Sequence, residues 1–280
     1  MEKENKVLPY LMMLPSILLM SLVVIYPIIM GVITSFQQQE SGGYGFENYR
    51  YFFENDYHTT GIWYTLKIVV ITVVAAIAIS YLLAIFLRFS NTPISRLMGK
   101  LYILPRFIPA LVAVNGMITV IRDSGLINRI SQVFGYNLHL NMMYDEKGII
   151  LMNLWFNIPF ATMMISAALS AINDSEVEAM RDVSASKTMI FTNLILPLTY
   201  RDVFVAATFI FMSNISSFTT PYLMGATYPK MMGVTLFDLY NNFHYGRAAA
   251  LSVIMFLFSS VAASIYIYIN MRKDKWEVGR

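Results

Sequence analysis

The sequence predicts an all-α membrane protein with six transmembrane helices. The chain has 280 residues, of which 57% are hydrophobic and only 13% are charged, whereas soluble domains carry about 25% charged residues. Its apolar residues form six runs, each near or above the ~20 residues that a spanning helix needs. The expected spans are residues 8–36, 62–87, 101–121, 148–172, 203–223 and 247–271. With no linker or repeat in view, residues 1–280 are expected to form a single transmembrane domain.

The composition excludes several classes of function. The net charge is only +3, which predicts no nucleic-acid partner. The chain has no cysteine, and its three histidines lack the spacing of a metal site. We therefore expect no metal, no cofactor and no catalytic site. Leu101 follows Gly99-Lys100, so the phosphate-binding Gly-x4-Gly-Lys-Ser/Thr motif is missing. The chain is not expected to be an enzyme, and ATP hydrolysis would belong to a separate subunit.

The first span is expected to be retained in the membrane. No residue is charged from Val7 to Gln39, a run far longer than the apolar core of a signal peptide, which has about 7–15 residues. Pro15 and Pro27 lie inside this run and are expected to kink the helix.

Polar side chains inside the later spans are candidates for a translocation path. Arg106 is the only charge deep in the third span, between Pro105 and Pro109. It either lines a path or lies at a bent helix end and reaches water. The fifth span is unusually polar from Ser213 to Thr220, where hydroxyl groups either line a cavity or pack helices together. The expected path residues are Arg106, Asn157, Ser213, Asn214, Ser216, Ser217 and Thr220.

The polar stretch of residues 173–197 separates the fourth and fifth spans and predicts a helical hairpin. Ser175, with Glu178 three residues later, fits a capping box for a first helix that runs to about Ala185. A second helix would carry an apolar stripe until Pro197 ends it. Something must bury that stripe, and one hypothesis is that the hairpin rests on lipid headgroups.

A more detailed pattern in the hairpin favours a different hypothesis. It consists of Glu178-Ala179-Met180, Arg181-Asp182, Ser184-Ala185-Ser186, Phe191 and Ile195-Leu196-Pro197. This pattern resembles the EAA loop of binding-protein-dependent ABC importer permeases. Met180 stands where the family has Ala, and Ser184 stands where it has Gly. If that glycine has a positive φ, Ser184 costs on the order of 1–2 kcal/mol.

Three further segments are similar to these permeases: Phe46-Glu47-Asn48-Tyr49, Gly125-Leu126-Ile127-Asn128, and Phe218 with Pro221 and Gly225. The resemblance implies the permease subunit of an importer in a bacterial-type cytoplasmic (inner) membrane. Its implied partners are two ATPase subunits, a second permease subunit that is related or identical, and an extracytoplasmic substrate-binding protein. The residues implied to dock the ATPase are Glu178, Ala179, Met180, Asp182, Ser184, Ala185 and Phe191.

The implied solute is small and polar. The Arg181-Asp182 pair is more similar to the branch that includes spermidine/putrescine, iron and phosphonate permeases than to the sugar branch, so a polyamine is favoured and the other classes stay open. The rival hypotheses are a secondary transporter and a membrane scaffold without an ATPase. No Asp or Glu lies within the expected spans, which counts against a proton-coupled carrier.

The distribution of basic residues predicts that both termini are cytoplasmic. With the N-terminus inside, the cytoplasmic segments hold twelve Lys and Arg residues and the outer loops hold six. The inner residues are Lys3, Lys6, Arg88, Arg96, Lys100, Arg181, Lys187, Arg201, Arg272, Lys273, Lys275 and Arg280, and the outer ones are Arg50, Arg122, Arg129, Lys147, Lys230 and Arg247. This orientation places the hairpin in the cytoplasm.

Overall fold

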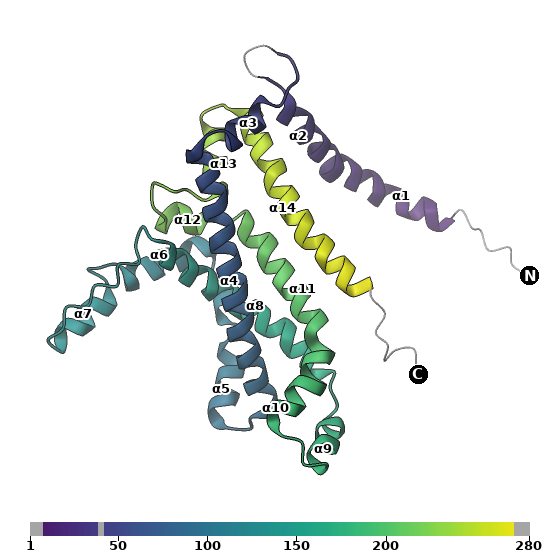
Figure 1. The fold of residues 1–280 in the computed structure, drawn as a ribbon, viewed down its shortest axis with the longest axis vertical. Helices are drawn as coiled ribbons and strands as arrows, with labels where there is room; N and C mark the ends of the chain where they lie inside the picture. The colour runs from purple at the N-terminus through teal and green to yellow at the C-terminus, as the bar shows by residue number, and fades with distance from the viewer. Residues whose placement is uncertain (1–7, 39–41, 272–280) are drawn as a thin grey trace, which may run out of the picture. The chain divides into compact units, whose positions relative to one another are not determined.

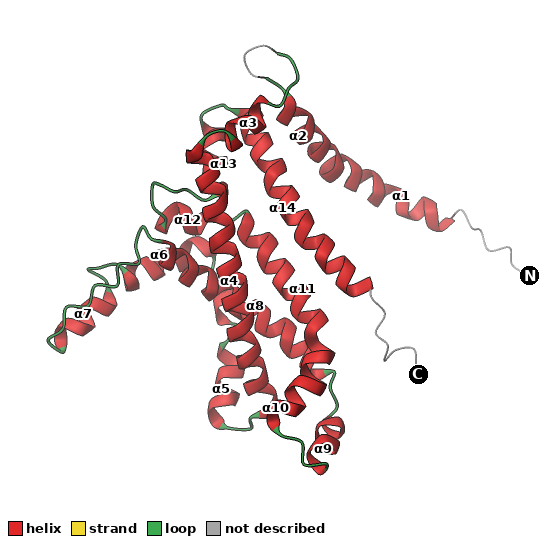
Figure 2. Ribbon diagram, viewed as in Figure 1, coloured by secondary structure: helices red, strands yellow, loops and turns green. Residues whose placement is uncertain are grey.

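The computed structural model describes residues 8–38 and 42–271, and this part of the chain is helical (Figures 1 and 2). The one strand-like feature described is an isolated bridge between Gln37 and Tyr44. Six described helices are long and apolar enough to span a membrane. They are Leu11–Phe36, Asp56–Phe89, Ala110–Val133, Glu146–Ser170, Lys187–Ile215 and Tyr245–Met271. The expected all-α fold with six spans is therefore confirmed.

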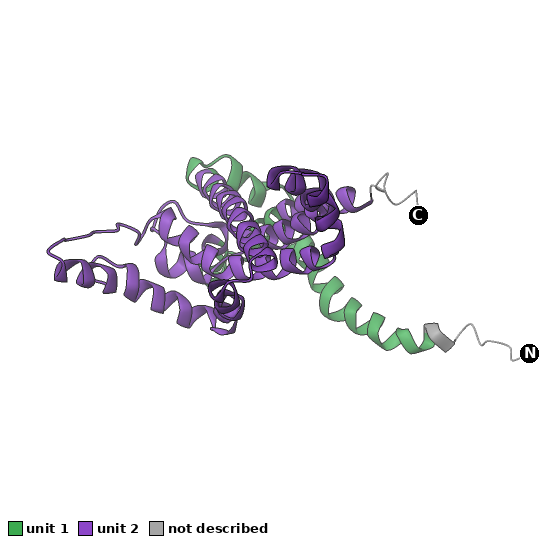
Figure 3. Cartoon of the chain, turned by 90° about the horizontal axis from the view of Figure 1, so that it is seen from below, with its two compact units in different colours: residues 1–59, 236–256 green, residues 60–235, 257–280 purple. Residues whose placement is uncertain are grey.

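Some residues used in the orientation argument lie outside the described part. They are Lys3, Lys6, Arg272, Lys273, Lys275 and Arg280. The described chain separates into two compact units, one made of residues 1–59 and 236–256 and the other of residues 60–235 and 257–280 (Figure 3).

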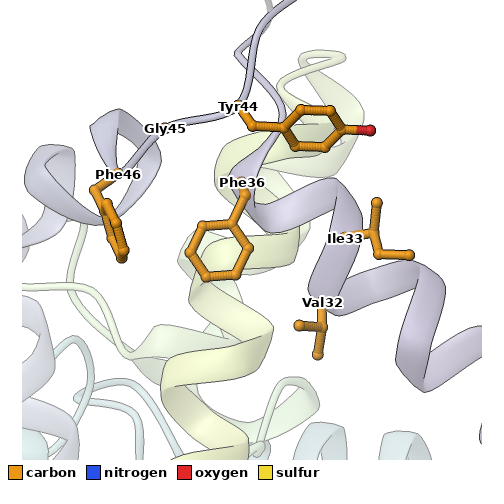
Figure 4. A pocket seen from close by; sticks show the side chains of 6 residues that line it. All are labelled: Val32, Ile33, Phe36, Tyr44, Gly45 and Phe46. Atoms are coloured by element: carbon orange, nitrogen blue, oxygen red, sulfur yellow. The ribbon is translucent and has the colours of Figure 1, made fainter.

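In the first unit, hydrogen bonds join the end of helix α2 (Tyr26–Phe36) to helix α3 (Glu47–Phe53). The buried Asn48 amide donates to the carbonyl oxygens of Ser35 (3.0 Å) and Gln37 (2.9 Å). The Ser35 and Tyr49 hydroxyls lie 2.7 Å apart. Beside them is an almost wholly apolar pocket of about 340 Å³, around which Figure 4 shows the aromatic rings. Its lining residues are Val32, Ile33, Phe36, Tyr44, Gly45 and Phe46.

Two prolines in the spans are each preceded by a π-helical turn. Helix α1 (Leu8–Met20) continues through the π turn η1 (Ser21–Ile25), where the Tyr26 amide donates to the Ser21 carbonyl just before Pro27. Proline lacks an N–H, and its ring crowds the carbonyl four residues earlier. A wider turn removes that carbonyl from its α-helical position, so the helix can continue past the proline.

The same arrangement explains why Pro197 does not end the second hairpin helix, as the sequence had predicted. Helix α10 (Lys187–Ile190) passes into the π turn η3 (Phe191–Ile195) and then into α11 (Leu196–Ile215). The Leu196 amide donates to the Phe191 carbonyl, five residues back. The second arm of the hairpin and the fifth span are consequently one helix, Lys187–Ile215.

In the second unit, helices α4 (Asp56–Phe89) and α8 (Glu146–Ser170) run parallel to each other. Three contacts at successive positions along the two helices show this parallel arrangement. Lys67 pairs with Glu146 at 2.8 Å, the Ser80 hydroxyl donates to the Ile158 carbonyl at 3.0 Å, and Arg88 donates to the Ile172 carbonyl at 3.2 Å. Helix α11 packs along α8. The core between them contains Ala76, Ala84, Ala161, Ile165, Leu169 and Ile210.

The third span begins later than the sequence predicted. Residues 101–109 hold the end of α5 (Pro93–Leu101) and the short 3-10 turn η2 (Leu104–Phe107), and α6 (Ala110–Ile121) starts after Pro109. Because prolines lack an amide hydrogen and push the preceding residue out of the α region, Pro105 and Pro109 break the expected helix. The helix α7 (Leu126–Val133) follows α6 and makes up the rest of this candidate span.

The fifth span ends earlier than predicted. Helix α11 stops at Ile215, and a separate helix, α12 (Thr219–Met224), follows after a break. The break packs against Gly233 at the start of α13 (Met232–Asn241), where an added Cβ would overlap the Ser217 carbonyl oxygen. The sixth span is α14 (Tyr245–Met271).

Candidate functional site

The hairpin begins with helix α9 (Asp174–Asp182), whose N-cap residue is Asn173. Ser175 lies within the first turn, so the expected capping box is wrong. Asp174 and Glu176 in this turn favour the positive end of the helix dipole. Asp174 also accepts a 2.6 Å contact from Arg88, which ties α9 to the last turn of α4.

A tight turn joins the two arms of the hairpin. Ser184 has a φ of +59°, in the left-handed region that favours glycine. The Ser184 amide donates to the Arg181 carbonyl (2.8 Å), and the Ala185 amide donates to the Met180 carbonyl (3.0 Å). These two bonds form a Schellman motif at the end of α9. Ser186 then caps α10, because its hydroxyl accepts from the Met189 amide at 3.2 Å.

The apolar stripe of the hairpin is buried by the chain's own spans. Val177, Ile190 and Ile195 are only 4%, 7% and 5% exposed. They pack with the ends of α4 and α8, and Phe191 meets the Tyr81 ring edge to face at 5.7 Å. Lipid headgroups are therefore not needed to cover this stripe.

The seven residues implied to dock an ATPase divide into two groups. Met180, Ala185 and Phe191 are partly buried against the core of the second unit. The exposed group is Glu178, Ala179, Asp182 and Ser184. The hairpin thus presents a small polar and acidic surface on one side, and its opposite side packs against the core of the second unit.

The expected path residues are not all brought together. Asn157 and Asn214 are buried and meet across α8 and α11, where the Asn157 amide donates to the Asn214 side-chain oxygen at 3.4 Å. The Arg106 guanidinium lies over the Phe160 ring, 5.4 Å from its centroid. The break after Ile215 divides the polar run from Ser213 to Thr220 between α11, the break and α12, so its hydroxyls do not lie along one helix. Of the remaining residues, Ser213 and Ser216 are exposed, Ser217 is half-buried and Thr220 is buried.

The comparison with protein families decides the assignment. Residues 76–275 match the family described as "Binding-protein-dependent transport system inner membrane component". The chain belongs to this family. It is thus a multi-pass permease component of an ABC importer in an inner membrane.

Relatives of this permease carry names that refer to different solutes. It is 28% identical to the sulfoquinovosyl glycerol transport system permease protein SmoG of Agrobacterium fabrum, over 96% of this chain and 92% of that protein. It is 28% identical to the thiamine transport system permease protein ThiP of Brucella abortus, over 83% of this chain but only 42% of that protein. Identity to the spermidine/putrescine permease PotB of Haemophilus influenzae is 22%, over 82% and 79% of the two chains.

Solved structures share the fold of this permease. A chain of the bacterial alginate ABC transporter, in complex with alginate pentasaccharide-bound periplasmic protein, matches with a TM-score of 0.78 at 18% identity, over 95% of this chain and 94% of that chain. A chain of the MetNI methionine ABC transporter matches with a TM-score of 0.54 at 19% identity, over 75% and 94%.

The structure adds two features that the sequence had not revealed. Asn157 pairs with Asn214 because α8 packs against α11, and Asn153 lies one turn earlier on α8, where its carbonyl also accepts from the Asn157 amide. Their spacing of four residues within an apolar helix was the available signal. The contact between Arg106 and Phe160 had no sequence signal, since it joins the 3-10 turn η2 to a helix far along the permease chain.

Proposed function

We propose that this permease moves a small polar solute inward, driven by ATP hydrolysis in two separate ATPase subunits that dock on the hairpin. A second permease subunit, related or identical, completes the pathway, and an extracytoplasmic substrate-binding protein delivers the solute. The charge distribution of the chain supports cytoplasmic termini and a cytoplasmic hairpin.

The observation that carries the proposal is the two-sided hairpin. One side is anchored by Val177, Ile190 and Ile195 in the permease core, while Glu178, Ala179 and Asp182 remain exposed. A rigid, outward-facing small residue such as Ala179 is suited to close packing against a partner. Force applied to this surface would pass to α8 and α11 through the buried side.

The substitution Ala179→Asp tests this assignment. A carboxylate at a close-packed contact would be left without water or a counter-ion. We expect the variant to insert normally, lose the ATPase subunits on affinity purification, and lose uptake. Asn91→Asp is the matched control, because it adds the same charge at an exposed site in the loop before α5, on the same side of the membrane.

If Ala179→Asp keeps both the bound ATPase and uptake, while Asn91→Asp behaves in the same way, the hairpin is not the docking site. If no ATPase is retained by the unsubstituted permease under conditions that preserve its fold, the coupled-transport proposal itself fails.

The solute class is a finer part of the proposal. The Arg181-Asp182 similarity favours a polyamine, with iron, phosphonate and sugar as alternatives. Relatives at 22–28% identity are named for sulfoquinovosyl glycerol, thiamine and spermidine/putrescine transport. Those names differ in the charge of the solute, so the chain's own charged groups are the better guide.

A further inference from the structure

Arg106 lies at an unusual depth for a charged side chain. Its guanidinium contacts Phe160 on α8, and α8 spans Glu146–Ser170. At a rise of 1.5 Å per residue, Phe160 is about 21 Å from the Glu146 end and about 15 Å from the Ser170 end. The contact is thus within a few Å of the middle of a helix that crosses a hydrocarbon layer of about 30 Å. Arg106 itself is exposed in the single chain and precedes Ala110, where the candidate third span begins, so its depth is inferred from its neighbour Phe160.

Arg106 has no counter-ion within the described residues. No described carboxylate forms an ion pair with it, and the one described interaction of its side chain is the contact with Phe160. Charged groups at this depth face a bundle interior or a water-filled cavity, because lipid solvates them poorly. A guanidinium stacked on an aromatic face keeps its N–H donors available in its plane.

A second, independent observation lies on the same helix. Asn153, Asn157 and Phe160 follow one another at spacings of four and three residues, which places them on one face of α8. Asn153 is only 3% exposed, and its amide nitrogen has no hydrogen-bond partner. Asn157 meets Asn214 of α11 at 3.4 Å. A buried amide without a partner costs free energy, so such a group commonly marks a place for a water molecule or a ligand.

We propose that this face of α8, together with Arg106 and Asn214, is a solute subsite that recognises an oxyanion group such as a carboxylate, sulfonate or phosphate. Arg106 provides the charge and planar donors for the oxyanion. Asn153, whose amide nitrogen has no hydrogen-bond partner, provides a neutral donor for the polar remainder of the solute. The inference rests on the proposed transport function, and it opposes the polyamine class, because a polycation would meet an unpaired positive charge in the path.

The charge preference of the subsite can be measured without knowing the solute. This chain has no native cysteine, so Asn157→Cys supplies its one thiol, and it is assembled with cysteine-free ATPase, binding-protein and partner-permease subunits. The probes are a sulfonate-bearing and a trimethylammonium-bearing methanethiosulfonate reagent, applied with and without trapped nucleotide. The rate of cysteine modification by each reagent is divided by that reagent's rate with a free thiol in solution. The ratio of the corrected rate of the anionic reagent to that of the cationic reagent is then recorded. Ser213→Cys, an exposed position beside Asn214, is the second reporter.

We expect the ratio to favour the anionic reagent in the presence of Arg106 and to fall about tenfold in Arg106→Gln, because a charge several Å away acts on both reagents with opposite sign. Arg106→Lys should retain most of the preference. Arg96→Gln is the matched control, since it removes one exposed positive charge on α5, and it should leave the ratio unchanged.

The subsite is refuted if Arg106→Gln leaves the ratio unchanged, or if neither thiol reacts in any nucleotide state. ATP hydrolysis stimulated by the binding protein is measured on the same preparation. If that stimulation is intact while the ratio does not respond to Arg106, the subsite alone is wrong. If stimulation is missing from the complex with Arg106 in place, the proposed transport function is wrong.

Discussion

The substitution Ser184→Gly should stabilise the turn between the two hairpin arms. Ser184 has a φ of +59°, and a residue with a Cβ loses about 1–2 kcal/mol in that region. Glycine removes this strain, but it also gains freedom in the opened state, worth about 0.5–1 kcal/mol. The net gain is centred on about 0.75 kcal/mol, which corresponds to roughly a two- to fivefold decrease in local opening.

Hydrogen exchange followed by mass spectrometry of the hairpin peptides is the direct assay, because it reports local opening. The informative amides are those of Ser184 and Ala185, which donate to the Arg181 and Met180 carbonyls. In Ser184→Gly they should exchange roughly two- to fivefold more slowly. Ser184→Val should exchange faster, because a β-branched residue is poorly tolerated at positive φ.

Ser186→Ala is the control that shows the assay can detect a change in this turn. It removes the hydroxyl that accepts from the Met189 amide, and loss of such a cap costs about 0.5–2 kcal/mol. The reasoning is wrong if Ser184→Gly leaves exchange at Ala185 unchanged or faster while Ser186→Ala produces its expected increase.

Three further predictions concern topology, packing and the path. An impermeant thiol reagent on intact cells should label single cysteines at 137 and 227 but not at 91 and 186, and external labelling at 186 would contradict the proposed orientation. The inner-loop cysteine is placed at position 91 because the nearby Ser95 is buried. No outer cysteine is placed at Ser41, which lies outside the described residues. Gly233→Ala should lower the thermal midpoint of the purified permease, because its Cβ would overlap the Ser217 carbonyl oxygen, whereas Gly116→Ala has open space and should not. Cysteines at 213, 216, 217 and 220 should change reactivity with nucleotide more than those at 210 and 215; equal protection in both states would mean that the hydroxyls only pack helices.

The fold was predictable because hydropathy determines where helices cross a membrane. The first, second, fourth and sixth spans contain few breaks, and long apolar runs are sufficient to locate such helices. The third and fifth spans were less predictable because proline has two opposite outcomes here. Pro109 precedes the start of α6, whereas Pro197 lies within a continuous helix after a π turn. The choice depends on backbone hydrogen bonding that hydropathy does not encode.

The candidate sites were predictable as residues but not as contacts. The hairpin pattern located Glu178, Ala179 and Ser184. Ser184 has the positive φ that would be expected if the family's glycine at this position is left-handed. The polar run from Ser213 to Thr220 was expected within one continuous span, because sequence alone does not reveal the contact between Ser217 and Gly233. The depth of Arg106 likewise depends on Phe160, more than fifty residues away along the chain.

The continuous helix from Lys187 to Ile215 has a mechanical consequence. At 1.5 Å per residue it is about 43 Å long, and it carries the capped turn of the hairpin at one end and Asn214 near the other. A flexible linker between these ends would absorb a displacement, but a rod converts it into a tilt, a screw rotation or a piston stroke at the far end. The π turn at Phe191–Ile195 also sets how the hairpin end of the helix is rotated about the helix axis relative to Asn214, since each residue advances an α-helix by about 100°. Deleting the exposed Asn193 from this turn would rotate the hairpin relative to Asn214.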